Sequence, residues 1–394
     1  MERWIDPNII IGNIAQGSNY YQRKRIENEI VVELEKGNHI LLSAPRRVGK
    51  TSIVKYLEQV KLVDKNCIFK NIQDIKSEKE FYKTIYELIL KSLKRNDQVK
   101  HSLKKFFSGR GIKSISLESG IEFIDKKDYN YKEEIRILIQ KLEDQQIKVI
   151  LFIDELPDVL HHLYLNNRKQ EALDILKSIR SWRQDFNQNA LLFVWTGSIG
   201  MRHIVRNISN STNDLNDLKE IKFKPFTINE ASKYIQRATE NASITYSDET
   251  ALYLINKIKY TIPYFINLML DEINKIAKEN NNKNISTKEV DAAFNNQVEE
   301  NEYFDDWRSR LYKYFKKQDA DFMNEVLIFI AHKGKINERQ VYDLAVKHSN
   351  TTTYMQLIRV LRNDGYIEKI DNHYYFISPF LSGFWLKNNP IYEN

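Results

Sequence analysis

Two short polar segments, each placed directly after an apolar run, carry residue types that bind phosphate and a divalent cation. The first, residues 44–51 (APRRVGKT), follows the apolar run 39–43 and precedes a segment with helical periodicity. It fits the pattern G-x-x-x-x-G-K-[ST], except that Ala44 stands in the first glycine position. Backbone N–H groups between a strand and a helix can surround a phosphate at the positive end of the helix dipole. The segment therefore predicts a phosphate-binding loop.

Individual residues of this loop have distinct predicted roles. Lys50 is expected to reach the β- and γ-phosphates of a nucleotide, and the Thr51 hydroxyl is expected to ligate Mg²⁺. Gly49 is expected to allow a close backbone approach that a Cβ would block. A basic turn without a ligand is the alternative. The predicted nucleotide-binding residues of the loop are Ala44, Pro45, Arg46, Arg47, Val48, Gly49, Lys50, Thr51 and Ser52.

The second polar segment is Asp154-Glu155, at the end of the apolar run 149–153. A continuous apolar run bounded by charge is typical of a parallel strand buried on both faces. Because open α/β sheets bind ligands at the carboxyl ends of their strands, Asp154 is predicted to hold Mg²⁺ through the ion's water shell. Glu155 is predicted to polarise the water that attacks the γ-phosphate. The alternative is that both carboxylates begin a solvated loop before Pro157.

A third apolar run, 191–195, ends in the small hydroxyl residues Thr196 and Ser198. In a sheet with a phosphate-binding loop this end lies beside the γ-phosphate, so either hydroxyl is a candidate to contact that phosphate or the attacking water. An ordinary strand-to-helix cap is the alternative. The predicted catalytic set is Lys50, Asp154, Glu155 and Ser198.

The elements that would position these segments alternate between strand and helix, which predicts an α/β fold with a parallel sheet flanked by helices. The pattern changes at Pro225 to a helical one, which predicts an all-α lid, and the last segment predicts three helices and a two-stranded wing. The expected strands are 39–43, 67–72, 149–153 and 191–195, the expected helices are 23–36, 51–60, 80–94, 131–145 and 168–186, and a hairpin is expected at 112–124. The expected domains are an N-terminal segment 1–38, a core 39–224, a lid 225–300, a linker 301–319 and a winged helix 320–388.

Composition sets limits on the class of protein. The chain has 394 residues, 42% of them hydrophobic, which suits several folded domains. Its net charge of +7 comes from 60 basic and 53 acidic residues that are mixed along the chain, so nucleic acid is permitted as a partner but not implied. Cys67 is the one cysteine, and no run reaches the ~18 apolar residues of a membrane helix. We expect a cytoplasmic protein with no membrane partner.

Together these segments resemble the P-loop ATPases of the archaeal-type ATPase and STAND class, relatives of the AAA+ ATPases. In that group a core, a helical lid and a winged helix follow one another, and the resemblance covers about residues 23–385. The segment 45–52 looks like the group's P-loop, and Asp154-Glu155 looks like its Walker B motif. The resemblance implies ATP and Mg²⁺ as cofactors and hydrolysis of ATP.

Further segments resemble the same group. Pro225-Phe226-Thr227 is similar to the segment that opens its lid, and Tyr21-Gln22-Arg23 resembles its aromatic-x-Arg segment beside the adenine. Residues 261–265 (TIPYF) look like the lid's Gly-x-Pro turn, which implies that Pro263 lies near the adenine, although Thr261 replaces the glycine. For Pro263 a helix N-terminus is the alternative. In a homo-oligomer an arginine from a neighbouring subunit would stabilise transition-state charge, and the candidates are Arg180, Arg183, Arg202 and Arg206.

The leading hypothesis is an ATP-driven switch whose winged helix, 320–388, transmits the change to a partner. One alternative is a DNA-engaging ATPase resembling origin-recognition or transposon target-selection proteins, with duplex DNA gripped by the winged helix. Its recognition helix offers Arg359 and Arg362, and its wing offers Lys369 beside acidic residues. The other alternative is a low-turnover signalling or phage-defence module of the STAND type. A winged helix that packs against the ATPase core or against a partner protein is the alternative to contact with DNA.

Overall fold

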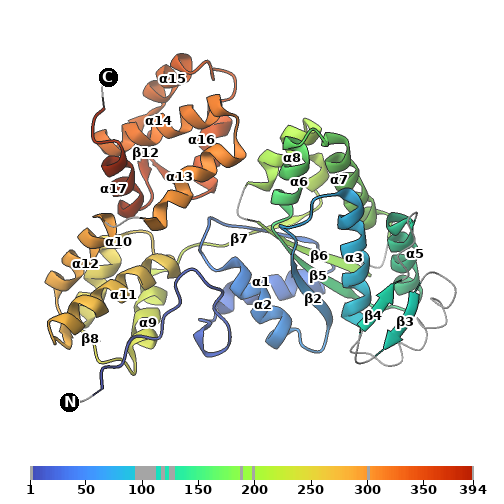
Figure 1. Ribbon diagram of the computed structural model, residues 1–394, viewed down its shortest axis with the longest axis horizontal. Helices are drawn as coiled ribbons and strands as arrows, with labels where there is room; N and C mark the ends of the chain where they lie inside the picture. The colour runs from blue at the N-terminus through green and yellow to red at the C-terminus, as the bar shows by residue number, and fades with distance from the viewer. Residues whose placement is uncertain are drawn as a thin grey trace. The chain divides into compact units, whose positions relative to one another are not determined.

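The computed structural model describes residues 3–93, 112–116, 120–123, 129–186, 190–197, 200–299 and 302–392. The chain divides into two compact units (Figure 1). The first, here called the sheet unit, consists of Gln22–Ser43 and Lys50–Lys222. The second, the helical unit, consists of Met1–Tyr21, Ala44–Gly49 and Phe223–Asn394, so the first residues of the phosphate-binding loop group with the helical unit.

The sheet unit is built around five parallel strands in the order β2-β5-β6-β1-β7. Every position of β5 and β6 is buried, which explains their continuous apolar runs. Because β6 lies between β1 and β5, the register places Thr196 beside both Asp154 and Leu42. The strands are β1 (Ile40–Ser43), β2 (Asn66–Asn71), β5 (Val149–Asp154), β6 (Leu191–Thr196) and β7 (Lys219–Lys222).

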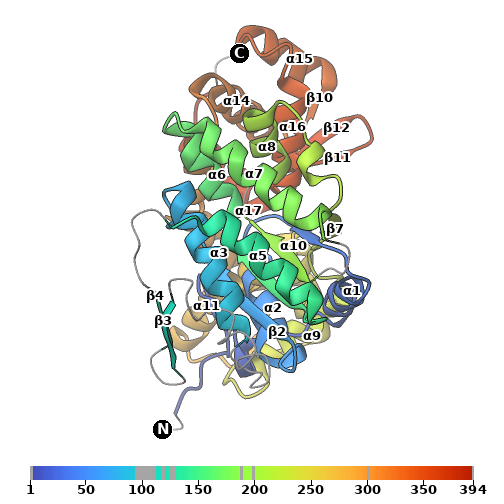
Figure 2. The same ribbon diagram turned by 90° about the vertical axis from the view of Figure 1, so that its right-hand side faces the viewer.

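Helices cover both faces of this sheet, with α1 and α2 on one side and α3, α6 and α7 on the other (Figure 1). This follows from right-handed crossovers, because the connection from β1 to β2 runs across the sheet in one direction and the later connections return. Helices α3 and α5 contact each other side by side (Figure 2). The helices are α1 (Lys24–Glu35), α2 (Lys50–Tyr56, continued by a π-helical turn, Leu57–Lys61), α3 (Glu78–Ser92), α5 (Tyr131–Asp144), α6 (Leu156–Leu165), α7 (Lys169–Gln184) and α8 (Met201–Ser209).

Three further elements of the sheet unit can be compared with the sequence expectation. The expected hairpin is present as the antiparallel strands β3 (Ile112–Ser116) and β4 (Gly120–Phe123). Strand β7 is not among the expected strands, because only Ile221 of its four residues is buried and an edge strand of this kind has no apolar run. Helix α6 begins directly after Glu155, where the alternative reading places a solvated loop.

The first part of the helical unit is a group of four helices. Thr227 caps α9 in a capping box with Glu230, which explains why this helix follows Pro225-Phe226-Thr227. A short parallel pair, β8 (Thr245–Tyr246) with β9 (Asn284–Ile285), joins two of the connections, and two-residue strands carry no sequence period that would predict them. The helices are α9 (Ile228–Thr239), α10 (Asp248–Ile258), α11 (Pro263–Glu279) and α12 (Thr287–Glu299).

The last part of the helical unit contains the expected order of three helices and a wing, as the predicted fold class requires. A helix, α13, occupies most of the segment 301–319, and α17 buries the aromatic residues Phe380, Phe384 and Trp385 in the interior. Strand β12 pairs with both β10 and β11 in a three-stranded antiparallel sheet. The elements are α13 (Glu302–Tyr314), α14 (Lys317–Lys333), β10 (Ile336–Asn337), α15 (Glu338–Lys347), α16 (Tyr354–Asn363), β11 (Ile367–Ile370), β12 (His373–Phe376) and α17 (Pro379–Asn388).

Candidate nucleotide site

The ends of three elements in the sheet unit bring Thr51, Asp154 and Thr196 together. Asp154 ends β5 and is 2% exposed. The hydroxyl of Thr51 donates a hydrogen bond of 2.8 Å to Oδ2 of Asp154, and the hydroxyl of Thr196 donates to Oδ1. A buried carboxylate needs such donors, because burial without partners is costly. The residues predicted to hold Mg²⁺ are therefore neighbours. Ser198, the hydroxyl residue of the predicted catalytic set, lies outside the described residues.

The donor atoms of this cluster suit magnesium. Mg²⁺ prefers oxygen ligands and usually takes only one or two carboxylates from the protein, with the remaining positions filled by water and substrate phosphate. Asp154 supplies one carboxylate and Thr51 one hydroxyl, and the two oxygens lie 2.8 Å apart. The residues present therefore fit the ion that the P-loop pattern implies.

Glu155 has an unusual backbone conformation at the junction of β5 and α6. Its φ of 63° and ψ of 32° are left-handed, which is uncommon for a residue with a side chain. Its N–H donates to the carbonyl oxygen of Thr196 at 3.1 Å, and α6 begins at the next residue with Pro157 in its first turn. Non-glycine residues held in this way cluster at functional sites, where surrounding structure maintains them. The junction thus fixes where the backbone of Glu155 lies relative to β6.

The phosphate-binding loop also contains left-handed residues. Gly49 has a φ of 99° and Arg47 a φ of 62°. A Cβ added to Gly49 would meet no heavy atom of the described structure within 4 Å, so the glycine is required for its backbone angle rather than by crowding from the protein. Lys50 follows as the first residue of α2 and is 7% exposed, and Val48 is 1% exposed.

Within the helical unit, the loop lies beside the turn that resembles the adenine-binding one. The guanidinium carbon of Arg47 is 4.1 Å from the ring centroid of Tyr264. Tyr264 follows Pro263, which is half-buried and is the first residue of α11. The alternative prediction for Pro263, the N-terminus of a helix, is therefore confirmed. Contact of Pro263 with a nucleotide stays a prediction. In the segment 21–23, which the resemblance also implies lies beside the adenine, the ring of Tyr21 packs edge-on against Phe226 with 5.3 Å between the ring centroids.

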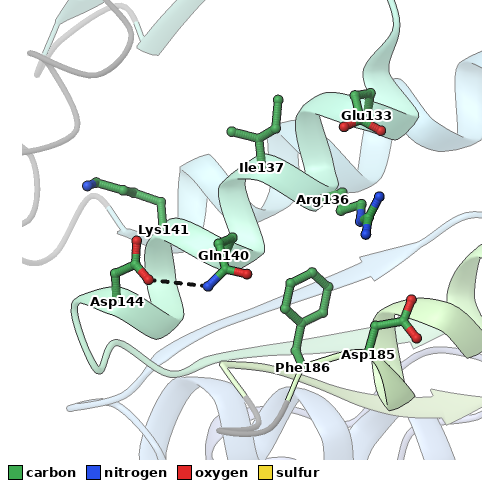
Figure 3. Close-up of a pocket in the computed structure, with 8 residues that line it drawn as sticks. All are labelled: Glu133, Arg136, Ile137, Gln140, Lys141, Asp144, Asp185 and Phe186. Atoms are coloured by element: carbon green, nitrogen blue, oxygen red, sulfur yellow. Dashed lines mark hydrogen bonds between the residues drawn. The ribbon is translucent and has the colours of Figure 1, made fainter.

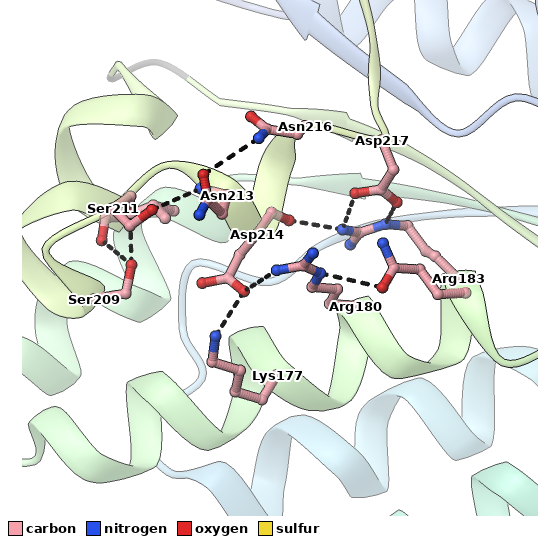
Figure 4. Close-up of polar contacts among 11 residues, drawn as sticks. Lys177, Arg180, Arg183, Ser209, Ser211, Asn213, Asp214, Asn216 and Asp217 are labelled. Carbon is pink, nitrogen blue, oxygen red and sulfur yellow. Dashed lines mark hydrogen bonds and ion pairs between the residues drawn. The ribbon is translucent and has the colours of Figure 1, made fainter.

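Three of the four arginines considered for transition-state stabilisation are ion-paired within the chain, and Figure 4 shows two of them, Arg180 and Arg183. Arg183 has a fully buried side chain, and it binds both carboxylate oxygens of Asp217 at 2.5 and 2.8 Å. Arg180 pairs with Asp214 at 3.3 Å. Arg202 pairs with Glu220 at 3.1 Å, whereas Arg206 has no ion pair to any described residue. The burial of Arg183 indicates a structural role within the sheet unit.

A surface hollow of about 460 Å³ lies between α5 and the end of α7 (Figure 3). None of the predicted site residues lines it. Its lining is mostly charged and polar, and Phe186 supplies a buried apolar wall. This hollow is therefore separate from the candidate nucleotide site. The lining residues are Glu133, Arg136, Ile137, Gln140, Lys141, Asp144, Asp185 and Phe186.

Comparison with known proteins bears on the fold. No protein-family model matches the chain, and no curated protein matches it in sequence. Among solved structures, the Walker-type ATPase of Pyrococcus abyssi is 16% identical with a TM-score of 0.60, and the match covers 94% of this chain and 97% of that one. The ORC2 protein of Aeropyrum pernix, solved in ADPNP-ADP complexes, is 11% identical with a TM-score of 0.52 over 96% of this chain and 95% of that one.

Each helix among the described residues is too short or too polar to cross a membrane.

At sequence identities of 16% and 11%, the likeness to these structures concerns the fold. The five-stranded parallel sheet, the helical segment after it and the winged-helix arrangement follow one another in the predicted order. The chain has the fold of the archaeal-type P-loop ATPases related to AAA+.

Proposed function

We propose that this chain binds ATP with Mg²⁺ at residues 44–52 and hydrolyses it. The observation that carries the proposal is the cluster of Thr51, Asp154 and Thr196 at the carboxyl ends of neighbouring strands and the start of α2. Two fold neighbours support it, because one is described as a Walker-type ATPase and the other is an ORC2 protein seen with ADPNP and ADP. Homo-oligomerisation and a partner at residues 320–388 belong to the same proposal.

Each residue of the site has a distinct task in this reaction. Lys50 binds the β- and γ-phosphates. Thr51 and Asp154 would hold Mg²⁺, which supplies positive charge against the phosphate oxygens. Glu155 orients a water molecule and accepts its proton as the water oxygen bonds to the γ-phosphorus and the bond to the β,γ-bridging oxygen breaks. ADP and inorganic phosphate are the products. Thr196 is a positioning residue, since it acts through the Asp154 carboxylate.

Two substitutions separate binding from turnover. We expect Lys50→Ala to abolish ATP binding, because the side chain that meets the phosphates is lost. Glu155→Gln should retain binding and lose turnover by about 100-fold or more, since the proton acceptor is removed. Isothermal titration with Mg-ATP measures the first effect and phosphate release the second.

Lys55→Ala is the matched control, because Lys55 lies on the same helix, its amine 5.5 Å from the Phe69 ring centroid. It should leave both measurements near the wild-type values. Hydrolysis by Glu155→Gln at the wild-type rate would refute the role of Glu155.

Helix α16 and the wing carry few basic side chains that are free of acidic neighbours. Arg359 and Arg362 are exposed on α16. Lys369 on the wing is ion-paired with Glu338, so its charge is already partly neutralised. The exposed side chain of Met355 adds an apolar group to the same helix. These features support a protein partner for the winged helix in preference to duplex DNA.

A further inference from the structure

One carboxylate of the helical unit binds two arginines of the phosphate-binding loop. Oδ2 of Asp306, on α13, lies 2.8 Å from Nη1 of Arg46 and 3.2 Å from Nη2 of Arg47. Both arginines belong to the stretch of the loop that groups with the helical unit, so these contacts are internal to that unit. The Asp306 side chain is 49% exposed, and those of Arg46 and Arg47 are 28% and 20% exposed. The contact is therefore half-exposed on the Asp306 side, whereas Nη1 of Arg46 is itself buried.

Two further contacts hold the same loop. The Arg47 guanidinium stacks on the Tyr264 ring of α11 at 4.1 Å. Pro45 lies against Gly365, which precedes β11, so closely that a Cβ on this glycine would be 2.7 Å from the proline Cβ. Asp306 is thus part of a set of contacts, from three elements, that fixes the loop within the helical unit.

Asp306 and its surroundings act in opposite directions on the charge of Arg46. Burial lowers the pKa of Arg46, the nearby positive charge of Arg310 lowers it further, and Asp306 acts in the opposite direction. Asp306 is thus the carboxylate that Arg46 and Arg47 share. The phosphates of ATP carry more negative charge, and their geometry also suits guanidinium groups, so they are stronger partners for the same donors.

We propose that Asp306 is an internal competitor of the nucleotide phosphates: it holds Arg46 and Arg47 on α13 until ATP takes over these arginines and releases α13. This inference rests on the proposed function, because it requires ATP to bind the loop. Coupling of this kind is reciprocal, so ATP must weaken the hold on α13 by the factor by which Asp306 weakens ATP binding. Two partly exposed ion pairs correspond to a factor of about two to ten.

The test compares Asp306→Asn with Asp305→Asn in the full chain. Both variants lose one negative charge from the same exposed stretch of α13, but the Asp305 side chain has no hydrogen bond or ion pair to a described residue. We expect Asp306→Asn to lower the Kd for Mg-ATP about two- to tenfold and Asp305→Asn to leave it unchanged. Asp306→Glu retains the carboxylate, so its Kd for Mg-ATP should stay within about twofold of the wild-type value. This result would show that the charge of Asp306, and not a change of fold, is responsible.

Hydrogen exchange of α13 supplies a second readout. Amides of residues 302–314 should exchange faster in Asp306→Asn without nucleotide, and faster in the wild type once Mg-ATP is added. If the wild type binds ATP but Asp306→Asn binds it equally or less tightly, the competition is refuted and the proposed function stands. If exchange of α13 in the wild type is unchanged by ATP, the release of α13 is likewise refuted. If the wild type binds no ATP, both the proposed function and this inference fail.

Discussion

Replacing Thr196 with valine removes one of the two hydroxyl donors of the Asp154 carboxylate while nearly preserving the shape of the side chain. Thr196 is 1% exposed and Asp154 is 2% exposed, so water has little access to replace the lost donor. Hydrogen bonds to charged groups contribute about 1.5–3 kcal/mol, and leaving a buried acceptor unsatisfied adds a desolvation cost. We expect the free energy of opening β5 and β6 to fall by about 2 kcal/mol.

Thr196→Ser is the matched control, because it retains the hydroxyl and loses a methyl group worth about 0.8 kcal/mol. Native-state hydrogen exchange at the amides of β5 and β6 is the suitable assay, since the chain has two units and overall unfolding is not a two-state process. The Mg²⁺ concentration needed for half-maximal phosphate release should also rise in Thr196→Val, because Asp154 is less firmly held. Equal exchange in the two variants, with an unchanged Mg²⁺ requirement, would refute the role of Thr196.

Two other features give independent predictions. Burial lowers the pKa of His39 to about 4, and its Nδ1 accepts the N–H of Phe193 at 3.2 Å. The unfolded chain then binds the extra proton between about pH 6.5 and 4. Lowering the pH from 7 to 5 should therefore destabilise the wild type by about 2 kcal/mol more than His39→Gln, and native-state hydrogen exchange of β1 and β6 at both pH values measures this difference. In Gly197→Ala the new Cβ would lie 2.6 and 2.8 Å from Cγ and Cδ of Pro157. Native-state hydrogen exchange of β6 should show a loss of about 1–3 kcal/mol in the free energy of opening, and exchange at the wild-type rate would rule out the clash.

Much of the sheet unit could be predicted because its central strands are buried on both faces. The runs 149–153 and 191–195 are apolar at every position, a pattern that edge strand β7 and the two-residue strands do not share. The sequence could not show which hydroxyl at the end of β6 contacts Asp154. Two hydroxyls, Thr196 and Ser198, follow one another closely in sequence, and only the register of β6 against β5 places Thr196 opposite Asp154.

Helix α6 shows why a local signal can mislead. Pro157 suggests a loop when it is taken with the charged residues before it, yet proline is well tolerated in the first turn of a helix, where its missing N–H has no partner to lose. The left-handed backbone of Glu155 makes the sharp change from strand to helix possible. Nothing in the identity of a glutamate predicts that conformation.

By itself, the sequence was enough to predict a phosphate-binding loop, since the glycine, lysine and threonine at fixed spacing follow a strand and begin a helix. Only the tertiary structure decided which side chains surround that loop. Asp306 lies in a stretch that reads as a charged linker, and a lone aspartate among other charges has no recognisable pattern. Its role follows from packing between segments distant in sequence, which places its carboxylate against Arg46 and Arg47.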